Sequence, residues 1–128
     1  MTTDRLFCGL AVAVLAGLAA FQVLLILGKP LGRFAWGGQH EVLPTRLRVG
    51  SCVGVAIYAV AAVVFLARAN LLPMVTPDHG GITFGTWVLA VYFTLGIALN
   101  AISRSRPERL VMTPVALLLA VSGWVLAA

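Results

Sequence analysis

The chain has 128 residues, of which 61% are hydrophobic and only 10% are charged. Soluble domains are roughly 45–50% apolar and about 25% charged, and a chain this short cannot bury such an excess of apolar surface in water. The composition therefore excludes an ordinary soluble domain and predicts a protein that faces lipid. The net charge of +5 comes without a soluble basic face or a nucleic-acid motif, so it favours topology signals and anionic lipid over nucleic acid.

Four uninterrupted apolar runs occupy residues 6–27, 49–67, 82–102 and 110–127. Each has 18–22 residues, close to the roughly 20 that a helix needs to cross about 30 Å of hydrocarbon. A membrane barrel would need short strands of alternating polarity instead. We therefore predict an all-α fold, an integral membrane four-helix bundle that forms a single domain over residues 1–128. Its connecting loops are expected at 28–48, 68–81 and 103–109.

The first run resembles a signal peptide only in part. It is longer than the apolar region of a typical signal peptide, and it follows a balanced Asp4–Arg5 pair rather than a basic cluster. We expect it to be retained as a membrane helix.

The distribution of basic residues predicts the orientation. Seven lie in the first and third loops, whereas the opposite side has only Arg5 and Arg68. Because cytoplasmic loops carry the excess of Lys and Arg, we expect the first and third loops in the cytoplasm and both termini outside. The seven are Lys29, Arg33, Arg46, Arg48, Arg104, Arg106 and Arg109.

This topology separates the two cysteines. Cys8 falls near the outer end of the first helix and Cys52 near the inner end of the second, too far apart for a disulfide. Both are interpreted as small packing residues.

The fourth helix has an identifiable start. Ser105 to Glu108 match a capping box, in which Ser105 caps the helix and Glu108 reaches back to the cap, with Pro107 in the first turn. The helix is therefore predicted over residues 106–127. Pro114 lies inside it and predicts a kink near Thr113.

Small residues recur at helical spacing in the first three helices. Such rows allow helix backbones to approach closely in lipid. Packing within the four-helix monomer is the favoured interpretation, and a dimer interface is the alternative. The residues are Gly9, Ala13, Gly17, Ala16, Ala20, Gly50, Gly54, Gly85 and Gly96.

No Asp, Glu, His, Lys or Arg lies in the central part of any apolar run. This argues against proton-coupled transport and membrane catalysis, which usually place ionisable groups in the bundle. A small multidrug antiporter has a carboxylate in its first helix, where this chain offers Gln22. The candidate intramembrane polar residues are Gln22, Tyr58 and Asn100. Interhelical hydrogen bonds, worth roughly 0.6–2 kcal/mol each, are favoured over ligand contact.

The first loop is the better candidate for a functional surface. Its Gly37–Gly38 pair allows a tight turn or an anion-binding nest of N–H groups. His40 and Glu41 are too few for a metal site, and an interfacial hydrogen-bonding role is favoured over catalysis. We predict no catalytic, metal-binding or cofactor-binding residue. The candidate surface comprises Lys29, Arg33, Trp36, Gly37, Gly38, His40, Glu41, Arg46 and Arg48.

Three segments carry a family resemblance: GKPLGRFAWGG at residues 28–38, LPTRLRVGS at 43–51 and NAISRSRPERLVMTPVA at 100–116. They resemble a functionally uncharacterised family of small bacterial four-helix integral membrane proteins. Its members have a Gly-x-Pro-x-Gly-x-x-Ala-(Trp or Met)-Gly-Gly pattern after the first helix and a Ser-Arg-x-x-Glu-Arg-like pattern before the last. The resemblance covers nearly the whole chain and implies the fold but no activity. The signature residues here are Gly28, Pro30, Gly32, Ala35, Trp36, Gly37, Gly38, Ser105, Glu108, Arg109 and Pro114.

These observations predict a multi-pass protein of the bacterial plasma membrane. A non-enzymatic binding or accessory protein is favoured, with the basic loop engaging anionic lipid head groups or a membrane-protein partner. A small transporter or channel that acts as a homo-oligomer is the alternative. An enzyme that acts on a lipid head group through His40 and Glu41 comes third.

Overall fold

The structure is a computed structural model that describes residues 2–128. It contains four long helices, α1 (Thr2–Ile26), α2 (Thr45–Arg68), α3 (Gly80–Ala101) and α4 (Arg106–Ala127). Two short 3-10 turns, η1 (Gly32–Phe34) and η2 (Trp36–Gly38), lie in the first loop. The described residues include no strand, so the predicted all-α four-helix fold is confirmed. All four helices are long and apolar enough to cross a membrane, which indicates a multi-pass membrane protein.

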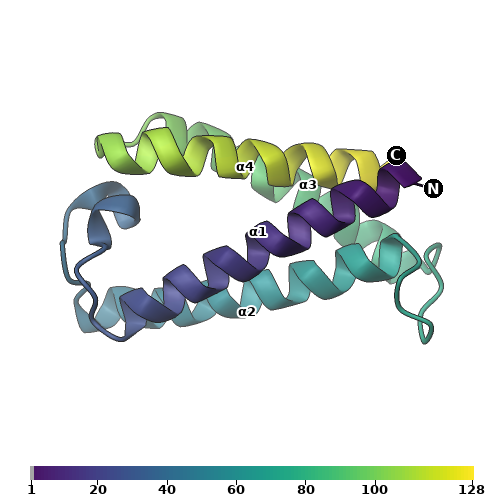
Figure 1. Ribbon diagram of the computed structural model, residues 1–128, viewed down its shortest axis with the longest axis horizontal. Helices are drawn as coiled ribbons and strands as arrows, with labels where there is room; N and C mark the ends of the chain where they lie inside the picture. The colour runs from purple at the N-terminus through teal and green to yellow at the C-terminus, as the bar shows by residue number, and fades with distance from the viewer. Residues whose placement is uncertain (1) are drawn as a thin grey trace.

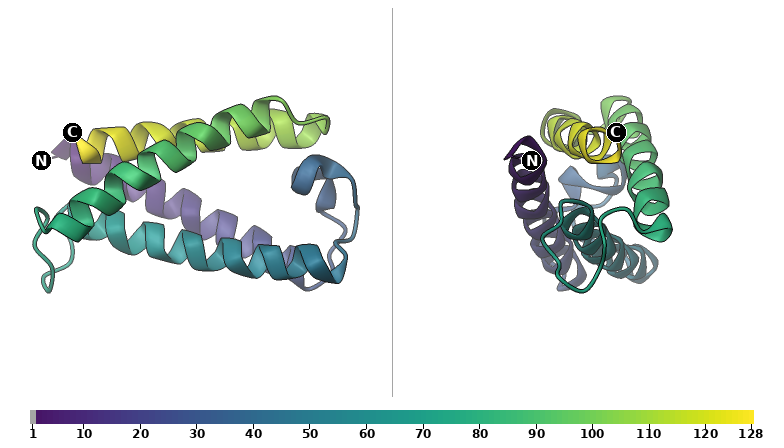
Figure 2. Two further views of the ribbon diagram at one scale, coloured as in Figure 1. Left: turned by 180° about the vertical axis from the view of Figure 1, so that it is seen from behind. Right: turned by 90° about the vertical axis from the view of Figure 1, so that its right-hand side faces the viewer.

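The helices form two antiparallel pairs, α1 with α2 and α3 with α4, and packing is most extensive within each pair. The pairs meet at the end that carries both termini and separate toward the end that carries the first loop (Figure 1). Seen along the bundle, the helices surround the two turns of the first loop (Figure 2). The loop therefore lies between the separated pairs.

Two helices end where a residue adopts a left-handed backbone conformation. Gly28, after α1, has a φ of 88°, and Asn70, after α2, has a φ of 60°. At the first site Lys29 N–H donates to Leu24 O and Gly28 N–H to Leu25 O, the pattern of a Schellman motif. These bonds satisfy carbonyls that the end of a helix would leave without partners.

The start of α4 confirms one half of the predicted capping box. Ser105 Oγ accepts a 3.4 Å hydrogen bond from Glu108 N–H, and the helix begins at Arg106. The reciprocal bond does not form: Ser105 N–H donates to Ser103 Oγ, and the Ser103 hydroxyl donates to the Glu108 carboxylate. Ser103 thus joins the two groups that the motif would connect directly. The helix continues without interruption through Pro114.

Buried apolar side chains form two separate clusters. The larger lies at the end with the termini and draws on all four helices. The smaller lies beneath the first loop, where Leu25, Ala35 and Leu43 pack with Phe21, Leu31 and Leu47. The larger contains Cys8, Ala11, Leu15, Ala61, Phe65, Ala69, Leu89, Phe93, Leu119, Ala120 and Leu126.

The small residues of α1 do not mediate packing within the monomer. A β-carbon at Gly9 or Gly17 would have no neighbouring atom within 4 Å, so the favoured interpretation is wrong for this row. The closest glycine contact between helices lies elsewhere: a β-carbon at Gly123 would approach Ala90 Cα to 3.0 Å. This contact permits the close packing of α3 and α4.

Arg68 connects three segments at the end with the termini. Its guanidinium donates to Leu126 O in α4 at 2.7 Å and to Pro77 O in the second loop at 3.1 Å, and it pairs with Asp78 at 3.0 Å. Arg68 is therefore a structural residue as well as a topology signal. Both cysteines are free, Cys8 in the core and Cys52 on the surface of α2.

Candidate functional site

The first loop contains a left-handed turn whose first residue, Trp36, packs against α2. Trp36, Gly37 and Gly38 have φ values of 53°, 75° and 70°, a conformation that is costly for a residue with a side chain. The Trp36 ring lies across Gly50, where a β-carbon would approach the ring to 2.7 Å, and its Nε1–H donates to Ser51 Oγ at 3.2 Å. These contacts with α2 stabilise the strained position.

The same turn is docked on the start of α4. The Ser105 hydroxyl donates to Arg33 O, and a β-carbon on Gly38 would overlap the Ser105 side chain. Within the loop, Gly32 N–H donates to Glu41 O at 2.8 Å, and a β-carbon on Gly32 would overlap the His40 carbonyl. Gly38 therefore allows the loop backbone to approach Ser105, and Gly32 allows it to approach the His40 carbonyl. The Gly38 N–H is used internally, because it donates to Ala35 O at 2.8 Å.

The basic residues of the first and third loops divide into two groups. Arg48 and Arg109 are half-buried and bond to loop carbonyls, Arg48 Nε to Leu43 O at 2.8 Å and Arg109 to Ser103 O at 3.0 Å. The other five are exposed at the same end of the molecule. They are Lys29, Arg33, Arg46, Arg104 and Arg106.

His40 and Glu41 contribute to the loop through their backbones. Their carbonyls pack against or bond to Gly32, whereas the Glu41 side chain is exposed and that of His40 is half-buried. Within residues 2–128, no group of three or more His, Cys, Asp or Glu side chains is placed to hold a metal ion.

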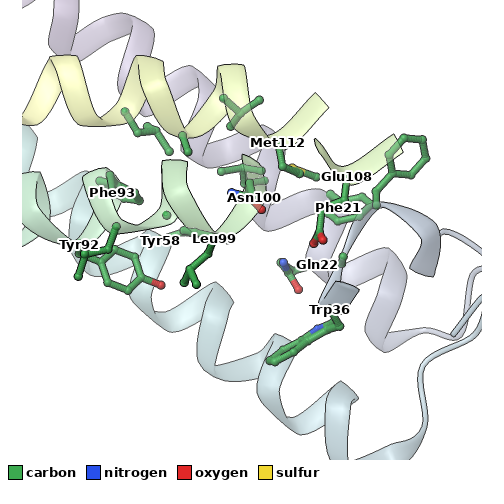
Figure 3. A pocket seen from close by; sticks show the side chains of 18 residues that line it. Phe21, Gln22, Trp36, Tyr58, Tyr92, Phe93, Leu99, Asn100, Glu108 and Met112 are labelled. Atoms are coloured by element: carbon green, nitrogen blue, oxygen red, sulfur yellow. The ribbon is translucent and has the colours of Figure 1, made fainter. Parts of the chain in front are cut away.

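A cavity of about 340 Å³ lies between the two apolar clusters. All four helices and both turns of the first loop contribute to its wall (Figure 3). Trp36, Tyr92, Leu95 and Leu99 line it and are also exposed, so part of its wall lies at the surface of the molecule. The lining is Leu18, Phe21, Gln22, Phe34, Ala35, Trp36, Tyr58, Tyr92, Phe93, Leu95, Gly96, Leu99, Asn100, Glu108, Met112, Val115, Ala116 and Leu119.

The structure brings all three candidate intramembrane polar residues to this cavity. Gln22 comes from α1, Tyr58 from α2 and Asn100 from α3. Gln22 Oε1 is buried and has no donor within 3.5 Å, and the Tyr58 hydroxyl, which lines the same cavity, is its potential donor within the protein. A buried acceptor without a partner costs about 1–3 kcal/mol, so a donor from the Tyr58 hydroxyl or from a bound molecule would stabilise this position.

Glu108 completes the polar lining; the sequence predicted a capping role for it and a place in the family signature, and no place in a cavity. Its side chain is 8% exposed and points into the cavity on the same side as Gln22 (Figure 3). Among the described residues, no Arg, Lys or His lies within 4.0 Å of the carboxylate. Helical spacing offers a signal for its position, because Met112, Val115 and Leu119 follow it on one face of α4 and also line the cavity.

The remaining wall is rich in aromatic side chains. Phe21 and Phe34 meet edge to face, with ring centres 6.3 Å apart, and Phe93 packs in the same manner against Tyr92 at 5.2 Å. The exposed Arg33 guanidinium stacks on Phe34 at 4.8 Å, yet Arg33 does not line the cavity. The site therefore combines a large apolar and aromatic surface with a few convergent polar groups, as small-molecule sites do.

Comparison with known proteins adds no further constraint on the site. No family model matches the chain, and neither a curated protein nor a solved structure matches it.

Proposed function

We propose that this chain is a non-enzymatic binding protein of the bacterial plasma membrane. It holds one small amphipathic molecule in the cavity between the helix pairs. The observation that carries the proposal is the buried Gln22 Oε1, which has no partner and lines a cavity of about 340 Å³. Protein interiors are close-packed and most buried polar atoms are paired, so an unpaired acceptor that also borders an open space supports a ligand at this position.

The position of the cavity supports a ligand that comes from the membrane. Its rim includes Leu95 and Leu99, which are 60% and 67% exposed on α3, and a lipid-facing opening admits a molecule with a large apolar part. The polar groups lie deeper, where Gln22, Asn100 and Glu108 come together. An amphipathic molecule satisfies both parts of the wall.

The proposed function also includes contact between the first-loop end of the molecule and anionic lipid, which the exposed basic residues support. Five cationic side chains at one end would lie at the level of cytoplasmic head groups and attract anionic lipid. This end carries the docked first loop, so lipid contact and the shape of the cavity depend on the same element. The resemblance of the loop motifs to those of small bacterial membrane proteins, inferred from the sequence, is the reason for proposing the bacterial plasma membrane.

The test is native mass spectrometry of protein released directly from its membrane. Gly96→Leu places a side chain in the cavity, because Gly96 lines it and faces Ala116. Gly17→Leu makes the same change on an open surface of α1, where no atom lies within 4 Å. We expect a bound small molecule that Gly17→Leu retains and Gly96→Leu loses. The same bound molecules in both variants would overturn the proposal.

A further inference from the structure

We infer that the ligand is an organic cation, a protonated amine with an apolar or aromatic body, whose ammonium group pairs with Glu108. This inference rests on the proposed function, because it names the chemical class that the same cavity binds. Three features of the cavity wall support it: its charge, the placement of its hydrogen-bond acceptors and its aromatic side chains.

The charge of the wall is negative at one point and neutral elsewhere. Glu108 is the only residue with a formal charge among those that line the cavity, and it is 8% exposed. A buried carboxylate needs an opposite charge or several hydrogen bonds to offset its lost hydration. The Ser103 hydroxyl supplies one such bond, and a ligand cation would supply the opposite charge.

The neighbouring basic side chains do not supply that charge. Arg109, next in sequence, donates to Ser103 O at 3.0 Å, and Arg48 donates to Leu43 O at 2.8 Å. Arg33 stacks on Phe34 from the exposed side, and Arg106 is exposed. Arg104, four residues before Glu108, is exposed as well. These basic side chains are therefore directed to the loop backbone or to the surface, and the cavity keeps a net negative wall.

The acceptors distinguish a protonated amine from a quaternary ammonium. Gln22 Oε1 has no donor, and the Glu108 carboxylate lies on the same side of the cavity. A protonated amine has N–H donors for both oxygens, whereas a quaternary ammonium has none. A neutral or anionic ligand would leave the carboxylate without an opposite charge.

The aromatic wall completes the match. Phe21, Phe34, Trp36, Tyr58, Tyr92 and Phe93 all line the cavity. Aromatic faces within about 6 Å attract cations, most strongly where water is excluded. The apolar body of the ligand would pack on Leu95, Leu99 and Met112, which line the same space.

Three probes of similar size and different charge test the inference: benzylammonium, benzyl alcohol and benzoate. The protein is placed in nanodiscs of zwitterionic lipid and labelled with carbon-13 at the methionine methyl groups. Met112 lines the cavity, whereas Met74 is 86% exposed in the second loop and serves as the internal control. We expect benzylammonium to shift the Met112 signal, with an affinity at least about tenfold higher than that of benzyl alcohol. Benzoate should bind more weakly than benzyl alcohol, and Met74 should not respond.

Two matched variants assign the preference to one carboxylate. Glu108→Gln keeps an acceptor for Ser103 and removes the charge, so the preference for benzylammonium over benzyl alcohol should fall to about twofold or less. Glu41→Gln removes an exposed charge outside the cavity and should leave the preference unchanged. The comparison of the three probes on the unaltered protein requires no variant, so it stands even if Glu108→Gln fails to fold.

Three outcomes would overturn the inference. One is equal affinity for the three probes, which would leave a cavity that binds ligands without charge selection. Another is a preference for benzylammonium that Glu108→Gln retains in full. The third is no response of Met112 to any probe. None of these outcomes decides the proposed function. That proposal depends on the native mass spectrometry test, which asks whether Gly17→Leu retains a bound small molecule that Gly96→Leu loses.

Discussion

The backbone of Gly38 lies directly against the side chain of Ser105, the residue that caps the start of α4. A β-carbon at residue 38 would overlap Ser105, whose hydroxyl also donates to Arg33 O, 72 residues away in the chain. Through this contact the first loop is fixed between the two helix pairs. The contact also fixes one wall of the cavity, because Phe34, Ala35 and Trp36 come from the docked segment.

Gly38→Ala should destabilise the protein more than Gly37→Ala. Both residues have a positive φ, 70° and 75°, so both substitutions carry the backbone cost of about 1–2 kcal/mol. Only Gly38 also meets Ser105, since the nearest side-chain atom to a β-carbon at Gly37 is 4.0 Å away. We expect a total loss of about 3 kcal/mol or more for Gly38→Ala. Unfolding of the two variants in mild detergent measures the difference, and equal losses would show that the docking contributes nothing.

Gly50→Ala should displace the Trp36 ring. The new methyl group would lie 2.7 Å from two ring carbons, so the ring must move, and its hydrogen bond to Ser51 would break. We expect a loss of about 1–3 kcal/mol and a changed fluorine-19 signal from fluorotryptophan at position 36. Gly54→Ala is the control, because its methyl group would meet Gln22 at an ordinary distance of 3.8 Å. An unmoved Trp36 signal in Gly50→Ala would contradict the packing described above.

The four helices are predictable from sequence because each apolar run has the length that the bilayer demands, and local chemistry marks their ends. Ser105 predicts the start of α4 for this reason. The position of Glu108 was not predictable in the same way. A capping motif specifies bonds along the chain, whereas the direction of the carboxylate depends on how α4 packs against α1 and α3. The Ser103 hydroxyl then takes the place of the expected bond.

The packing partners of the small-residue rows could not be predicted from the sequence either. Spacing at four residues identifies a smooth helix face but does not say which helix covers it, and the exposed Gly9 and Gly17 look identical in sequence to glycines that are covered. Gln22 and Asn100 are a similar case. The sequence identifies them as neutral polar side chains inside the bundle, but they line a common cavity because the two helix pairs separate.

Arg68→Gln should lower stability far more than Asp78→Asn. The guanidinium of Arg68 is largely buried and bonds to carbonyls of α4 and the second loop, and hydrogen bonds to a charged group are worth about 1.5–3 kcal/mol. Asp78 is 95% exposed, so its ion pair should contribute about 1 kcal/mol or less. Unfolding free energies of the two variants test this ranking. Similar losses for both would mean that the ion pair, rather than the carbonyl bonds, holds the three segments.

The first loop should be reachable only from the cytoplasm, and the second only from outside. Glu41→Cys and Asp78→Cys place single thiols at exposed positions of the two loops, in a background in which Cys8 and Cys52 are replaced by alanine. An impermeant maleimide added to intact cells should label the thiol at position 78 alone, because the positive loops face inward. Inverted vesicles should show the opposite pattern. Labelling of position 41 from outside would reverse the orientation.

Neutralising exposed arginines near the first loop should weaken the retention of anionic lipid. Each Arg close to an anionic surface contributes about 1 kcal/mol, so Arg46→Gln combined with Arg104→Gln should reduce retention of phosphatidylglycerol roughly tenfold or more. Arg5→Gln removes an equally exposed charge from the opposite end and should retain the lipid, because the positive-inside rule puts that end away from the anionic leaflet. Native mass spectrometry after delipidation in mild detergent gives the ratio of bound to free protein. Equal loss of lipid from all variants would show that retention follows net charge alone, and that the basic end has no special affinity.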